Sequence, residues 1–289
     1  MTYPQRRSNR NSLNGSQAMI SRSCIARLCL GVMVLCLFGM GRAAAPAEVA
    51  PHRAVYDLSL DNTRGHGDVA DVSGTMLFEW ADSCDGWSVT QRTAMSFTYQ
   101  TGETVDLGWN VVTWESKDGL RYRFFIRNFD NGSVKDEYRG EAHLDGHGKG
   151  GVADYTLPEK RTVVLPPGVL FPTAHTVELI KRVEAGDKLF WATVFDGFDN
   201  DGLSDISAAI AARLKTEAGA GSRFPLLAAG PSSRVSLAFY GRNSDSAEPE
   251  HEQVLRLHEN GVVEDITLDF GDFSVAGKLK ELKSLPPPC

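Results

Sequence analysis

The sequence predicts an all-β protein, a many-stranded antiparallel sheet that curls into an open, barrel-like form and packs against one helix. Polar and apolar residues alternate in ten successive segments beyond residue 51. Short clusters of Gly, Asn and Asp separate the segments, as hairpin turns require. A single stretch has helical spacing instead, so the helix is an exception within the sheet.

The alternation is clearest in GLRYRFFIRNF, residues 119–129. Its apolar side chains fall on one face and its arginines on the other: Leu120, Tyr122, Phe124 and Ile126 against Arg121, Arg123 and Arg127. This pattern predicts a half-buried antiparallel strand. The same alternation occurs in nine other segments, residues 52–60, 72–80, 87–100, 104–115, 133–144, 188–197, 234–242, 250–270 and 274–285.

The helix is predicted over residues 172–186. Thr173 can cap the amino end, Pro172 precedes this cap, and Gly186 can end the helix. The apolar positions recur at helical spacing, at Val177, Ile180 and Val183. A lone amphipathic helix needs apolar surface to cover, so we expect it to plug the concave side of the curled sheet.

Two kinds of segment remain between these elements. The stretch DISAAIAARL, residues 205–214, is left undecided because its alanines favour a helix while its surroundings favour a strand. Residues 215–233 and 243–252 have the composition of loops. No internal repeat or second linker is seen, so a single domain is predicted over residues 48–289.

The first 45 residues have the order of a secretory signal peptide. Arginines precede the 13-residue apolar run LCLGVMVLCLFGM, and small residues follow it. The run is shorter than the roughly 18 to 20 residues that span a bilayer. We therefore expect cleavage near Ala45 or Ala47, export, and no integral membrane span after processing.

The charge of the chain is unfavourable for binding nucleic acid. The whole chain carries a formal charge of −7, with 30 basic and 37 acidic residues. Residues 1–45 contain six arginines and no acidic residue, so 24 basic and 37 acidic residues remain after cleavage, a charge of −13. Such a surface is expected to repel nucleic acid and anionic headgroups.

Cysteine usage indicates a disulfide. Three of the five cysteines would leave with the signal peptide, and Cys84 and Cys289 would remain. Two cysteines in an exported chain are expected to pair, and such a long loop would remove about 5 kcal/mol of unfolded-chain entropy. Two alternatives stay open, a free Cys289 and a bridge between two chains.

No catalytic residue is predicted. His175 has no nucleophile beside it in the sequence, so we interpret it, with Pro172 and Thr173, as a structural residue at the start of the helix, held by a hydrogen bond. No metal site or cofactor is predicted either. The acidic cluster FDGFDNDGLSD fails the spacing of a calcium-binding loop and reads as a turn, and His143, Asp145 and His147 read as exposed loop residues.

The tryptophans leave one question open. All five residues, Trp80, Trp87, Trp109, Trp114 and Trp191, lie on predicted strands. They can fill the core or line an apolar cavity, because a filled barrel and a hollow one have the same alternation.

Several segments together resemble the EipB family of cell-envelope integrity proteins. They are HRAVYDLSL, LPPGVLFPTAH with the helix after it, FYG, LHENGVVEDITLDFGDFSV and the pair Cys84 and Cys289. The resemblance implies a periplasmic protein of alphaproteobacteria, built as a β-spiral with a helix packed within it and distantly like the lipoprotein carriers of the Lol system. It also implies a disulfide between Cys84 and Cys289, and a role in envelope maintenance without known enzymatic chemistry.

Three functions follow in order of preference. The first is a non-enzymatic periplasmic protein that supports envelope integrity and stress resistance through contacts with a protein partner. The second is a carrier that holds an acyl chain of a lipid or lipoprotein in an apolar cavity. The third is a hydrolase that uses His175 with a distant Asp, which the missing nucleophile disfavours.

Overall fold

The computed structural model describes residues 49–64, 68–199, 201–214, 223–242 and 247–286. The chain divides into two units, Met1–Ala44 and Ala45–Cys289, and all described residues belong to the second. The predicted signal peptide (1–45), its cleavage positions Ala45 and Ala47, and Cys289 lie outside the described residues. Among the helices that can be described, none has the length and apolar character to span a bilayer.

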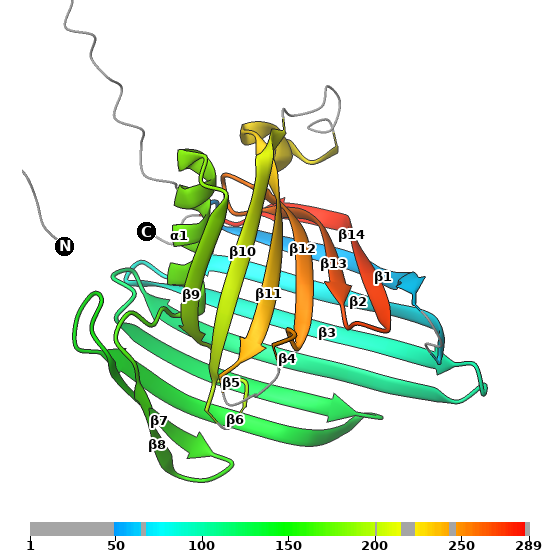
Figure 1. Cartoon of the computed structure of the whole chain (residues 1–289), viewed down its shortest axis with the longest axis horizontal. Helices are drawn as coiled ribbons and strands as arrows, with labels where there is room; N and C mark the ends of the chain where they lie inside the picture. Colours follow the sequence, from blue (N-terminus) through cyan, green and yellow to red (C-terminus); the bar gives the residue numbers. More distant parts are fainter. Residues whose placement is uncertain (1–48, 65–67, 200, 215–222, 243–246, 287–289) are drawn as a thin grey trace, which may run out of the picture. The chain divides into compact units, whose positions relative to one another are not determined.

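One antiparallel sheet holds all 14 strands found in this part of the chain (Figure 1). The first eight strands are β1 (His52–Thr63), β2 (Val69–Asp82), β3 (Gly86–Tyr99), β4 (Thr104–Ser116), β5 (Arg121–Asp130), β6 (Ser133–Leu144), β7 (Gly151–Leu157) and β8 (Arg161–Leu165). After them come helix α1 (Pro172–Ala185), β9 (Leu189–Phe195), β10 (Leu203–Leu214), the 3-10 helix η1 (Pro225–Ala229), β11 (Ser232–Gly241), β12 (His251–His258), β13 (Val263–Asp269) and β14 (Phe273–Ser284).

The strand order is β8-β7-β6-β5-β4-β3-β2-β1-β14-β13-β12-β11-β10-β9. Two meanders, β1–β8 and β9–β14, are therefore joined through the pairing of β1 with β14. In this seam Tyr56 lies opposite Leu279 on one side and Met76 on the other. Figure 1 shows β9–β12 crossing the long strands β3–β6, as a curled sheet requires.

The two ends of the sheet are brought together by the chain that follows β8. Leu170 forms a parallel bridge to Val194 in β9. Its N–H donates to the carbonyl of Thr193 at 2.9 Å, and its carbonyl accepts from the N–H of Phe195 at 2.9 Å. These bonds nearly close the sheet, so the predicted fold class, an all-β barrel-like sheet with one helix, is confirmed.

The alternation read from the sequence matches the burial of the strands. On β5, Tyr122, Phe124 and Ile126 are buried, whereas Arg121 and Arg123, which alternate with them, are exposed. We call the face that bears the buried residues the inner face of the sheet. The segment left undecided is β10, whose Ile206, Ala208 and Ile210 are buried on that face.

Helix α1 begins and ends close to the predicted residues. Pro172 is its first residue, and Gly186 follows it in the left-handed conformation at φ 79°. Its N–H bonds back to the last turn, which is the usual reason for glycine at this position. The predicted cap by Thr173 is wrong, because the preceding residue is Phe171 and no side chain of the helix start caps it.

Three apolar clusters line the inner face. Cluster 1 surrounds α1, cluster 2 lies on β4–β8, the chain before α1 and the adjoining ends of β9 and β10, and cluster 3 lies on β1–β3 and β13–β14. Burying each large aliphatic or aromatic side chain contributes about 1.5–3 kcal/mol. The residues that contact α1 therefore belong to the apolar core on the inner face of the sheet.

Candidate functional site: the inner face around helix α1

Helix α1 connects the two meanders by its packing. Its residues Leu179, Ile180 and Val183 are almost fully buried in cluster 1. The same cluster contains Trp80 of β2 and Val235 of β11. The helix thus packs on strands that are far apart in the sheet order.

The amino end of α1 is held by a carboxylate from β4. Glu115, of which only 2% is exposed, accepts the N–H of Thr173 at 2.8 Å through Oε2 and the N–H of Ala174 at 2.7 Å through Oε1. The first N–H groups of a helix have no partner within it, and a negative charge there is favourable. Glu115 therefore supplies, from a distant strand, the cap that the local sequence lacks.

The protonation of Glu115 is set by two opposed effects. Burial raises the pKa of its carboxyl to about 7, against the lowering effect of hydrogen bonds from Thr173 and Ala174. A carboxyl near this value changes its charge close to neutral pH. The charge that Glu115 presents to the start of α1 therefore depends on pH near neutrality.

His175 lies one turn into the helix and is also buried. Its ring stacks on Phe190 of β9, with centroids 5.5 Å apart, and burial lowers the pKa of the imidazole to about 4. Its Nε2 has no hydrogen-bond partner among the described residues. The hydrogen bond expected there is thus not made by Nε2, and His175 is held by ring packing as a neutral side chain.

A cavity of about 440 Å³ lies beside the start of the helix. It is lined by the first turns of α1, the turn after β4, the loop after β6 and the chain before the helix, with Trp87 at one side. The Nζ of Lys117 lies 3.2 Å from the centroid of the Trp87 ring and 2.8 Å from the carboxylate of Asp82. The volume falls in the range of small-molecule sites, and the lining mixes apolar and charged groups.

The inner face is incompletely covered between the clusters. Phe78, Leu255 and Val263 contact both cluster 1 and cluster 3, and Trp109 contacts both cluster 2 and cluster 3. All four side chains are only partly buried. These four residues form a half-exposed apolar strip between the clusters.

The far end of the inner face is filled instead. Five aromatic rings pack there with centroid separations of 5.0–6.3 Å, those of Tyr122, Phe124, Tyr155, Phe171 and Phe195. The two hydroxyls donate to backbone carbonyls of the loop after β9. This end is packed core, so it offers no room for a ligand.

The tryptophans divide between the two faces. Trp80, Trp87 and Trp109 contact the apolar clusters, whereas Trp114 lies on the opposite face beneath Arg123. Trp191 is 59% exposed and stacks on Tyr240. Core packing and cavity lining therefore apply to three of the five.

The acidic cluster after β9 forms a turn, as its spacing predicts. Asp196 accepts the N–H of Phe198, Asp199 accepts those of Asp201 and Gly202, and Asp201 accepts that of Leu203. Across the described ranges, no three His, Cys, Asp or Glu side chains come together in a way that could hold a metal ion.

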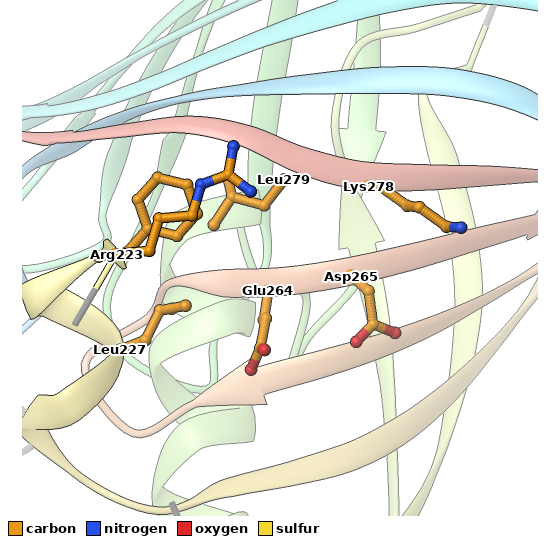
Figure 2. Close-up of a pocket in the computed structure, with 7 residues that line it drawn as sticks. Arg223, Leu227, Glu264, Asp265, Lys278 and Leu279 are labelled. Carbon is orange, nitrogen blue, oxygen red and sulfur yellow. The ribbon is translucent and has the colours of Figure 1, made fainter. Parts of the chain in front are cut away.

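A second cavity, of about 400 Å³, lies between η1 and strands β13 and β14. Figure 2 shows Glu264 and Asp265 on one strand, Lys278 and Leu279 on its neighbour, and Leu227 across the opening. The Glu264 carboxylate is already engaged, at 2.9 Å from Nε2 of His258 and 3.1 Å from Nε of Arg256. We take the cavity beside α1 as the candidate because it lies at the start of the helix that packs on both meanders.

Cys84 occupies the turn between β2 and β3. It has a positive φ of 68°, and its N–H donates to Asp82 Oδ1 at 2.9 Å. Its predicted partner Cys289 lies outside the described residues, so the bridge stays a prediction.

Comparisons with known proteins agree with the segments singled out in the sequence. Residues 43–286 match the EipB-like family. The chain is 30% identical over 252 residues to the cell envelope integrity protein EipB of Brucella abortus (strain 2308), covering 84% of this chain and 87% of the relative. It also superposes on the crystal structure of a β-barrel-like protein of unknown function from Brucella abortus with a TM-score of 0.74 and 27% identity, covering 83% of this chain and 99% of that one.

Proposed function

Because the chain belongs to the EipB-like family, we propose that it supports cell-envelope integrity as a non-enzymatic periplasmic protein, through contacts with a protein partner. The observation that carries this proposal is the family match, which spans the whole sheet and the helix, together with a relative named for envelope integrity. The buried titratable groups also support it, because Glu115 caps a helix and His175 packs on a ring rather than facing a nucleophile.

A deletion strain tests this role. We expect it to become more sensitive to detergent, bile salt and envelope-directed antibiotics, and a plasmid copy to restore resistance. Cell fractionation and the mass of the recovered amino terminus test the periplasmic location and cleavage near Ala45 or Ala47. Unchanged sensitivity of the deletion strain would contradict the role in the envelope.

A second function, an acyl-chain carrier, is favoured by the half-exposed strip of the inner face. Leu255 on this strip is flanked by Val254, which points to the opposite face of β12. Replacing Leu255 by Gln puts an amide into the apolar strip, whereas Val254→Gln alters the other face by the same chemistry. A carrier role also agrees with the Lol-like architecture that the family resemblance implies.

Native mass spectrometry of the protein recovered from cells, followed by displacement of a fluorescent fatty acid, distinguishes the two functions. A carrier should show lipid-sized extra mass and bind the probe, with Leu255→Gln weakening binding and Val254→Gln leaving it unchanged. If the protein has no extra mass and does not bind the fluorescent fatty acid, contacts with a protein partner remain as the mode of action.

We also propose that Cys84 pairs with Cys289 within one chain. The register supports this, because His52 lies between Trp80 and Ser284. Strands β2 and β14 run in the same direction on either side of β1, about 10 Å apart. In the sequence, Cys84 comes four residues after Trp80 and Cys289 five residues after Ser284.

The intact mass tests the bridge. A monomer lighter by two hydrogens, which regains them on reduction, is expected. A disulfide-linked dimer, or a monomer with two free thiols, would contradict the proposal.

A further inference from the structure

The outer face of β3–β6 carries a concentration of arginines. Their side chains point away from the inner face on alternate strand positions and are exposed: Arg92 on β3, Arg121, Arg123 and Arg127 on β5, and Arg139 on β6. Apolar residues lie among them, namely Val112 (46% exposed), Trp114 and Phe125. We call these eight residues the arginine face.

The pairing of the strands arranges this face in rows. Trp114 lies opposite Arg123, and in the next row Phe125 stands between Val112 and Arg139. The Cζ of Arg123 is 4.4 Å from the Trp114 ring centroid, and those of Arg139 and Arg127 are 4.4 and 4.6 Å from the Phe125 ring centroid. Stacking holds the guanidinium groups in place while their N–H groups remain available.

Few acidic groups neutralise these arginines. Within the same rows of β3–β6 the carboxylates on this face are Glu137 and Glu141, and Arg127 is bonded to Glu137 at 2.5 Å. The other four arginines make no ion pair with any residue that the structure describes. The face thus has a local excess of positive charge in a chain whose formal charge is −7.

The negative net charge of the chain predicts repulsion from anionic headgroups. The positive charge of the arginine face predicts attraction at that face. At physiological ionic strength the Debye length is about 8 Å, so acidic residues elsewhere on the molecule are largely screened at this face. The arginines that contact a surface directly are screened much less. Attraction at this face is therefore compatible with an acidic protein.

We propose that the arginine face docks on an anionic membrane surface, with its guanidinium groups on lipid phosphates. The arginines lie on β3, β5 and β6, which with β4 between them span about 14 Å across the sheet, and the six steps from Arg121 to Arg127 cover about 20 Å along it. Neither cavity described above reaches these residues, so the face suits a broad surface better than an inserted peptide. Guanidinium groups bind phosphate in a bidentate manner, and tryptophan favours the membrane interface.

Co-sedimentation of the purified protein with lipid vesicles tests the proposal. Binding to phosphatidylcholine vesicles that contain phosphatidylglycerol is expected, with loss at high salt and no binding to phosphatidylcholine alone. Each guanidinium removed should weaken binding about fivefold, so Arg121→Gln/Arg123→Gln should weaken it about 25-fold. The matched control is Arg234→Gln/Arg242→Gln, which removes the same charge from β11 and its end, outside the arginine face.

A second double variant tests the same proposal if the arginine variants are unstable. Glu137→Gln/Glu141→Gln removes the two carboxylates of the face and should strengthen vesicle binding. Three results would overturn the proposal: no binding to the anionic vesicles at low salt, equal losses in the control and test variants, or binding to polyglutamate but not to vesicles. The last result would assign the face to an acidic protein.

Discussion

The carboxyl of Glu115 makes a sharp test of how α1 is attached. Burial raises its pKa from 4.5 to about 7, so the folded protein holds a proton there that the unfolded chain has lost. A group whose pKa rises on folding contributes stability that is fully present below its unfolded pKa and is lost as the pH rises through its folded pKa. A rise of the pKa from 4.5 to about 7 corresponds to about 3 kcal/mol of unfolding free energy, which is lost between pH 4.5 and pH 8.

Replacing Glu115 by Gln removes this titration and keeps the size of the side chain. The amide retains one acceptor for the two N–H groups of Thr173 and Ala174, so the variant carries a fixed cost at all pH values. The difference in unfolding free energy between the variant and the wild type should therefore move by about 3 kcal/mol in favour of the variant from pH 4.5 to pH 8. In a domain of this size that equals about 6–12 °C in melting temperature.

Urea unfolding followed by tryptophan fluorescence, at pH 4.5 and pH 8 on both proteins, measures this difference. Asp196 also has a pKa raised to about 7 by burial, but its contribution is present in both proteins and cancels. A difference that does not change with pH, or that moves against the variant at high pH, would refute the reasoning. The second result would mean that the helix N-terminus stabilises the ionised carboxylate more than burial destabilises it.

Two further predictions concern buried and strained positions. The substitution His175→Phe keeps the stacking on β9 and removes a group whose pKa is lowered from 6.5 to about 4. The wild type loses stability when this imidazole must take up a proton, so the unfolding free energy of the variant relative to the wild type should rise by up to about 3 kcal/mol as the pH falls from 7 to 4. Urea unfolding measures this difference. An unchanged difference would mean that the ring is not buried. Gly197 and Gly186 share φ 79°, but a Cβ on Gly197 would lie 2.7 Å from the Phe124 ring, whereas one on Gly186 meets nothing within 4 Å. Thermal melting should therefore show a larger loss for Gly197→Ala than for Gly186→Ala, for which strain alone costs about 1–2 kcal/mol; equal losses would contradict the packing.

The alternation of side chains was enough to predict the sheet, because one face is buried along most strands. It failed to distinguish strand from helix over residues 205–214, where alanine-rich β10 is settled by its neighbours β9 and β11. The strands β7 and β8 were not predicted. They are short, seven and five residues, and β8 shows a single fully buried residue, Leu165, so each offers only a brief pattern.

Less of the candidate site than of the fold could be predicted from the sequence. The helix start around Pro172 was visible from local residues, but its cap is Glu115, 58 positions away from Thr173. One signal was present: Glu115 falls on the same side of its strand as Val111 and Thr113, where a carboxyl is unexpected. Sequence analysis can find such a misplaced charge, but only the fold shows which helix it serves.

The pairing of β1 with β14 has a consequence for how the chain is made. Synthesis proceeds from the amino end, so the meander β1–β8 is complete long before residues 273–284 exist. During this interval the hydrogen-bonding edge of β1 has no strand beside it, and open edges invite pairing with other chains. The contact that finally covers it joins His52 to Ser284, among the most distant pairs the described chain offers, so the last strand to be made governs when the nascent protein ceases to be prone to aggregation.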